Sequence, residues 1–72
     1  MEFDNRELVA LVDLKFRNHR EFGNAIGWSD SKVNYKLKSL RSWSVHDVGK
    51  AIIALGIKDG QIKRYFFTQK VQ

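Results

Sequence analysis

Apolar residues recur along the chain at intervals of three and four, which is the period of an α-helix that buries one face. The apolar run 51–57 has a composition that also suits a strand, but a serine cap before it and a glycine after it favour a helix. Helices are predicted over residues 5–16, 19–26, 30–40, 45–55 and 59–67. The residues expected to face inward are Leu8, Leu11, Val12, Phe22, Ile26, Val33, Leu37, Leu40, Val48, Ala51, Ile52, Leu55, Ile62, Tyr65 and Phe66.

Short polar side chains precede these segments, and such side chains accept hydrogen bonds from the free N–H groups of a first helical turn. The predicted caps are the pairs Asp4–Glu7, Asn18–Glu21 and Ser44–Asp47 and the single residues Ser29 and Asp59. The predicted hydrophobic staples are Phe3 with Leu8 and Trp43 with Val48. Gly27 and Gly56 are predicted helix ends, because glycine adopts the left-handed conformation without strain. The sequence therefore predicts an all-α protein of five helices in a single domain, residues 1–72, with a tail that is ordered only if Val71 docks.

The composition excludes several kinds of chemistry. Cysteine is absent from the 72 residues, so neither a disulfide nor a thiolate metal site can form. The two histidines, His19 and His46, have no acidic companion at metal-ligand spacing. No apolar run reaches the roughly 20 residues of a membrane span, and the acidic start lacks the positive region of a secretory signal. We therefore expect a cytoplasmic protein that is not an enzyme, with no metal, cofactor, small-molecule substrate or membrane partner.

The charge of the chain is unevenly distributed. The net charge is +5, but residues 1–14 carry −3, residues 15–41 carry +5 and residues 42–72 carry +3. A basic segment in a small domain commonly binds a polyanion such as nucleic acid. The other interpretation is a basic surface that is only solvated.

Residues 19–38 have the spacing of a DNA-binding helix-turn-helix. Gly23 is small at the point where two helices would cross, Gly27 follows four residues later, and Val33 is the branched apolar residue six positions after that. Trp28 follows the turn and is expected to pack into the core as an apolar side chain. We therefore predict that the second and third helices form a helix-turn-helix.

If Val33 and Leu37 face the core, the opposite side of the third helix is available to a partner. The predicted binding residues on or beside this helix are Ser29, Ser31, Lys32, Asn34, Tyr35, Lys36, Lys38 and Arg41, and those at the start of the helix before it are Asn18, His19 and Arg20. Asn34 suits adenine, and Lys32 or Lys38 suits guanine, in a major groove that accepts one helix. The free N–H groups at the start of the preceding helix favour a phosphate.

Several segments together resemble a known family. They are Phe22–Ser29, Lys36–Leu37, Trp43–Ser44, Ala54–Ile57, Ile62–Phe67 and Lys70–Val71. The chain resembles the Cro-like, lambda-repressor-like regulators of temperate phages of Gram-positive bacteria, and most of all the modulator-of-repression (MOR) antirepressors of lactococcal phages. The resemblance implies a five-helix lambda-repressor-like DNA-binding domain. It also implies a role in the lysis–lysogeny switch, with operator DNA and the DNA-binding domain of a phage CI-type repressor as partners.

The sequence departs from that family at Lys38–Ser39, where Asn-Gly is usual, and this predicts a longer recognition helix. Two functions stay open. One is an antirepressor that holds the CI-type repressor, and the other is a stand-alone Cro-type repressor that binds operator DNA without touching the repressor. Because a single domain offers few phosphate contacts, DNA binding would need a homodimer or a second protein. Of the adjacent Phe66 and Phe67, one must face outward as a candidate partner anchor.

Overall fold

The computed structural model of the protein describes residues 2–70, and the regular structure in this range is helical. The elements are α1 (Arg6–Lys15), α2 (His19–Ile26), α3 (Asp30–Lys38), α4 (Val45–Leu55) and α5 (Ile62–Phe66), with short 3₁₀ helices at Leu40–Ser42 and Asp59–Gln61. The prediction of an all-α chain with five helices is confirmed. The condition that orders the tail, docking of Val71, falls on a residue outside the described range.

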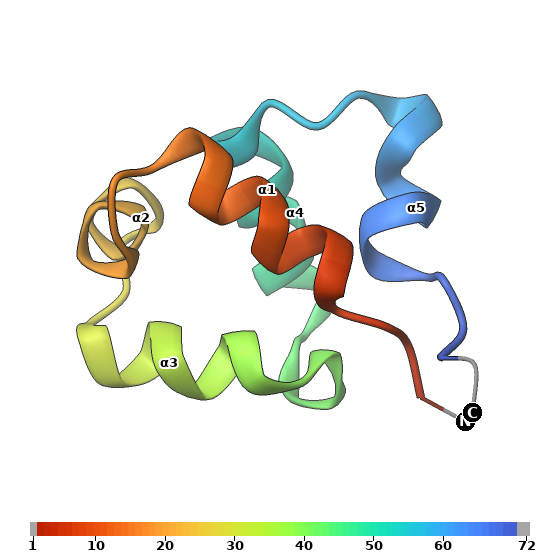
Figure 1. The fold of residues 1–72 in the computed structure, drawn as a ribbon, viewed down its shortest axis with the longest axis horizontal. Coiled ribbons are helices and arrows are strands. Elements are labelled where there is room, and N and C mark those ends of the chain that lie inside the picture. The colour runs from red at the N-terminus through yellow and green to blue at the C-terminus, as the bar shows by residue number, and fades with distance from the viewer. Residues whose placement is uncertain (1, 71–72) are drawn as a thin grey trace.

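The helices surround one core (Figure 1). In this view α3 runs along one side, α2 lies at one end, and α5 lies at the other end beside the two ends of the chain. The buried apolar residues come from all five helices and the segments between them: Leu8, Val12, Phe22, Ile26, Trp28, Val33, Leu37, Ala51, Leu55, Ile57 and Phe66. Within residues 2–70, no helix is both long enough and apolar enough to cross a bilayer.

Aromatic side chains form a continuous row through this core. Phe16, Phe22, Trp28, Trp43 and Phe66 contact one another in that order, with ring centroids 5.4–6.2 Å apart. Edge-on and tilted contacts of this kind place the positive edge of one ring against the negative face of the next. The row therefore connects the segments around α1, α2, α4 and α5 into one unit.

Most of the predicted helix ends are confirmed. The Asn18 side chain accepts a hydrogen bond from the Glu21 N–H at 2.9 Å, and Ser29 caps α3. The pair Ser44 and Asp47 forms a complete capping box at the start of α4. The helices α2 and α4 end at glycines in the left-handed conformation, with φ of 82° and 66°. Sequence spacing thus located these helix starts and ends, because they depend on hydrogen bonds between residues close in the chain.

The predicted capping box of the first helix is wrong. Asp4 accepts a hydrogen bond from the Arg6 N–H at 2.9 Å and forms an ion pair with the Arg6 guanidinium, which lowers the pKa of Asp4 to about 2. Glu7 instead pairs with Arg64 of α5, at 3.2 Å. Phe3 packs edge-on against Phe67, with ring centroids 5.5 Å apart. Phe3 and Glu7 are therefore both used for contacts with the C-terminal part of the chain.

Two other predicted caps differ from the structure. Asp59 makes no side-chain capping bond, because residues 59–61 form a 3₁₀ turn before α5 begins at Ile62. Glu21 does not complete a capping box with Asn18, because its carboxylate accepts from the Arg17 N–H at 3.2 Å. That hydrogen bond stabilises the bend between α1 and α2.

Gly23 on α2 lies close to the turn before α3 and to Val33 of α3. A Cβ atom at this position would lie 2.7 Å from the backbone oxygen of Trp28 and 3.0 Å from Cγ2 of Val33. The N–H groups of Gly27 and Trp28 both donate to the Gly23 carbonyl, at 2.8 Å each. The turn therefore folds back onto α2 with no room for a side chain.

We expect Gly23→Ala to destabilise the fold by about 1–3 kcal/mol, because the added methyl meets backbone that cannot move freely. Gly49→Ala is the matched control, since a Cβ on Gly49 would meet nothing within 4 Å. The control should stabilise α4 by about 0.5–1 kcal/mol through its higher helix propensity. Urea denaturation followed by circular dichroism measures both changes. Equal stability of the two variants would contradict the close contact.

Candidate partner-binding face on α3

The rotation of α3 is set by its two buried residues. Val33 is fully buried and Leu37 is 7% exposed, while Ser31, Lys32, Tyr35 and Lys38 are exposed on the opposite side. We call these four residues the α3 outer face. Tyr35 is 63% exposed, a large value for an aromatic side chain. Lys32 lies over the Trp28 ring, with its Nζ atom 5.1 Å from the ring centroid. This cation–π contact stabilises the position of the Lys32 side chain.

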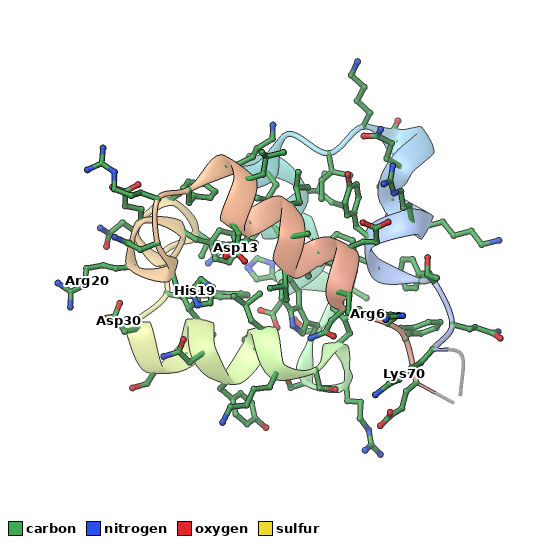
Figure 2. The ribbon with its side chains drawn as sticks, viewed as in Figure 1. Arg6, Asp13, His19, Arg20, Asp30 and Lys70 are labelled. Carbon is green, nitrogen blue, oxygen red and sulfur yellow. The ribbon has the colours of Figure 1, made fainter. Side chains whose placement is uncertain are left out.

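Asn34 lies at one flank of this face and not at its centre. Its Oδ1 atom is 3.4 Å from Nδ1 of His19, whose Nε2 is 3.3 Å from the Asp13 carboxylate. Figure 2 shows His19 between α1, which carries Asp13, and α3. The contact connects three helices beside a hollow of about 440 Å³ that includes Lys38. Asn34 and His19 thus help to orient α3, and Asn34 remains exposed beside the outer face.

Lys36 points inward, contrary to the prediction that it flanks the binding surface. Its ammonium group donates to the Asp47 carboxylate at 2.8 Å and to the Ser42 carbonyl, and its side chain is 13% exposed. At 100° per residue, Lys36 follows Val33 on the side of α3 that approaches α4. The hydrogen bond from Lys36, with a smaller contribution from the Ser44 N–H, lowers the pKa of Asp47 to about 2. Lys36 is therefore a structural residue.

Arg41 is not on α3, so its prediction as part of this helical face is wrong. The helix ends at Lys38, and Ser39 has an extended backbone, with φ of −161° and ψ of 144°. The Ser39 hydroxyl accepts from the Arg41 N–H at 3.2 Å and starts a 3₁₀ turn. The Arg41 guanidinium pairs with Glu2 at 3.2 Å. The expected lengthening of the helix at Lys38–Ser39 does not occur, because serine offers the backbone an alternative hydrogen bond.

Two side chains from elsewhere satisfy the last carbonyl groups of α3. The Asn5 amide donates to the Leu37 carbonyl at 2.6 Å, and the Trp43 indole donates to the Lys36 carbonyl at 2.7 Å. The free carbonyl groups at a helix end need such partners when water is excluded. These contacts fix where the outer face ends.

The basic middle segment does not form one continuous basic surface. Of its seven Lys and Arg residues, four form ion pairs: Arg17 with Glu21, Arg20 with Asp30, Lys36 with Asp47, and Arg41 with Glu2. Figure 2 shows Arg20 beside Asp30, at the end of the molecule formed by α2 and the start of α3. Lys32 and Lys38 are left as the cations of the outer face with no ion pair among residues 2–70.

The predicted residues at the start of α2 are already engaged. Asn18 is the cap, His19 contacts Asp13 and Asn34, and Arg20 pairs with Asp30. Ser29 is likewise the cap of α3.

A family model described as a protein of unknown function, DUF739, matches residues 1–69 of the chain.

The chain belongs to the DUF739 family. No curated protein sequence matches the chain. The resemblance to Cro-like and MOR proteins therefore stays a prediction. For this DUF739 chain, the structure brings together Ser31, Lys32, Tyr35 and Lys38, with Asn34 at their edge, and separates Lys36 and Arg41 from them.

Sequence reasoning missed the role of Asp47 as the partner of Lys36. The two residues are eleven positions apart, and Asp47 is also the third residue of a capping box that spacing alone explains. The only sequence signal is a carboxylate in the first turn of a helix, and that pattern is common on exposed helices. The pairing depends on how α3 and α4 pack.

Lys36→Met in the DUF739 domain should destabilise the fold by about 3 kcal/mol, because it leaves the buried Asp47 carboxylate without its cation. Lys38→Met, two residues further along α3, removes an exposed charge and should change stability by less than about 0.5 kcal/mol. Urea unfolding at neutral pH compares the two variants. Equal stability would show that Lys36 is not a structural residue.

The pH dependence of this difference is a control. Because the folded protein holds the pKa of Asp47 at about 2, below its usual 3.8, the ion pair stabilises the fold fully above pH 4. The stabilisation is lost as the pH falls through the pKa that Asp47 has in the folded protein. The stability gap between the parent and Lys36→Met should therefore narrow between about pH 4 and pH 2.

Proposed function

We propose that this chain is a small phage regulator that opposes a CI-type repressor through a helix-turn-helix domain. In this proposal the chain acts as an antirepressor that binds the repressor's DNA-binding domain through the α3 outer face. The observation that carries the proposal is an exposed helical face, held by its buried side against α2, with a protruding tyrosine and two lysines. The resemblance to MOR proteins supports the choice of partner.

The arrangement of α2 and α3 supports the helix-turn-helix assignment. Gly27 turns the chain in the left-handed conformation, Gly23 allows close approach, and Val33 packs into the space beside it. A helix of nine residues is about 13 Å long, a length that a groove or a concave protein surface can accept. The second helix of such a motif commonly presents its outer side to a partner.

The distribution of charge favours a protein partner over DNA. Two basic recognition surfaces repel each other, and this is the main physical objection to a complex between two helix-turn-helix domains. Here Arg20 is neutralised by Asp30 at the end of α2 and α3, so the repulsion is smaller than the sequence indicates. Tyr35 adds a rigid, amphipathic side chain of the kind that concentrates binding energy at protein interfaces.

Binding of operator DNA without the repressor is the second candidate function. Lys32, Lys38 and Ser31 face the same side as Tyr35, and Asn34 remains exposed at its flank. Such side chains can contact base edges and phosphates in a major groove. Few unpaired cations limit the affinity that one chain can reach by itself.

Tyr35→Ala should weaken binding to the repressor's DNA-binding domain at least about tenfold, because it removes the exposed aromatic side chain of α3. Val45→Ala, at an exposed position on α4, is the matched control and should leave the affinity unchanged. Isothermal titration calorimetry gives the affinity, and light scattering gives the mass of the complex. If the parent protein and the repressor domain, mixed at micromolar concentrations, elute separately in size-exclusion chromatography, the antirepressor proposal is wrong.

The salt dependence of DNA binding tests the second candidate. With two unpaired cations on the outer face, we expect log K to fall against log salt with a slope of about −2 per chain. Lys38→Met should reduce the magnitude of that slope by about one. Fluorescence anisotropy on the phage regulatory region and on a random duplex measures both. Equal affinity for the two duplexes would exclude an operator-specific function.

A further inference from the structure

The outward aromatic residue near the C-terminal end already has a partner within the chain. Phe66 is buried and Phe67 is 45% exposed, so Phe67 is the outward member of this adjacent pair. Its ring packs edge-on against Phe3, with ring centroids 5.5 Å apart. The exposed surface of Phe67 therefore belongs to the region where the two ends of the described chain meet, and not to the α3 outer face.

A hollow of about 440 Å³ adjoins the α3 outer face and is lined by residues of three helices. Val9 of α1 and Leu37 of α3 are its apolar lining, and the polar lining consists of His19, Asn34 and Lys38. We call it the α1–α3 hollow. Lys38 belongs both to this hollow and to the outer face, so the two surfaces are continuous. A protein that covers the outer face therefore also meets the hollow.

Contacts within the chain hold the lining of the α1–α3 hollow in place. The two ring nitrogens of His19 lie 3.3 Å from an Asp13 carboxylate oxygen and 3.4 Å from the Asn34 side-chain oxygen. Leu37 is 7% exposed, and its carbonyl accepts a hydrogen bond from the Asn5 amide at 2.6 Å. A preformed hollow of this kind costs less conformational entropy to fill than one that must first open.

Charge gives the α1–α3 hollow a direction. Lys38 forms no ion pair among residues 2–70, so its ammonium group is available to a carboxylate of a partner. The Asp13 carboxylate lies beside Nε2 of His19, and it would repel an acidic group placed at that end. The complementary partner therefore presents an apolar side chain that has a carboxylate on its Lys38 side.

We propose that the α1–α3 hollow receives one large aliphatic or aromatic side chain of the protein that binds the outer face, and that a carboxylate of the same protein pairs with Lys38. On a helical partner these two groups would be three or four residues apart, because that spacing places them on one face. Apolar anchors in well-packed pockets carry a large share of the binding energy of a protein interface. The inference rests on the proposed function, because the occupant belongs to the same partner.

Two substitutions at Val9 test the hollow, with the repressor's DNA-binding domain as the probe. Val9→Thr keeps the shape of the side chain but places a hydroxyl in the apolar lining, so binding should weaken about five- to tenfold. Val9→Phe fills the hollow and should weaken binding at least about tenfold. Val45→Thr and Val45→Phe, at a position on α4 that is 91% exposed, are the matched controls and should leave the affinity unchanged. Isothermal titration calorimetry measures the affinities, and circular dichroism checks that each variant is folded.

Charge reversal tests the pairing with Lys38. Lys38→Glu should weaken binding of the repressor domain at least about tenfold. Lys63→Glu makes the same change of net charge at an exposed position on α5 and should leave the affinity unchanged. Exchange of the acidic residues of the repressor domain for lysine, one at a time, should identify one that restores binding to Lys38→Glu. If none restores it, the pairing with Lys38 is wrong.

The results separate failure of the hollow from failure of the proposed function. NMR of the complex should show nuclear Overhauser contacts between the Val9 methyl groups and an apolar side chain of the repressor domain. Parent-like affinity of both Val9 variants, together with loss of binding in Tyr35→Ala, would overturn the hollow and leave the proposed function standing. The absence of any complex with the parent chain would overturn both. Weaker binding of a DNA duplex by the Val9 variants, with unchanged binding of the repressor domain, would assign the hollow to DNA instead.

Discussion

The direction of every side chain on α3 depends on the close approach of α2 and α3 at Gly23. The Trp28 carbonyl and Val33 occupy the space that a side chain at Gly23 would need, and α3 packs with Val33 and Leu37 inward. The Lys36–Asp47 pair then holds one flank of the helix against α4, and the His19–Asn34 contact holds the other. A face fixed at both flanks loses little conformational entropy when a partner binds.

Local patterns in the sequence predicted what local forces decide. The period of three and four placed Val33 and Leu37 in the core, and capping chemistry located the starts of α2, α3 and α4. The side-chain contacts at the start of α1 could not be predicted in the same way. Its Glu7 binds Arg64, which is 57 residues away, and no local pattern reports that contact. For the same reason, spacing alone could not decide whether Phe66 or Phe67 faces outward.

The candidate site was predicted only in part, because a count of charges does not show which charges meet. Lys36 and Arg41 are cations like the lysines of the outer face. Tertiary packing nevertheless pairs Lys36 with Asp47 and Arg41 with Glu2. The acidic N-terminal segment thus neutralises part of the basic middle segment.

The row of aromatic rings has a consequence for how binding could be observed. Trp28 lies in the turn before α3, and Trp43 donates to the Lys36 carbonyl near the end of α3, with the two indole rings 5.4 Å apart. Any movement of α3 relative to α4 changes the distance and orientation of these chromophores. The chain therefore contains an intrinsic optical reporter of the very helix that carries its outer face, and no label is needed to follow it.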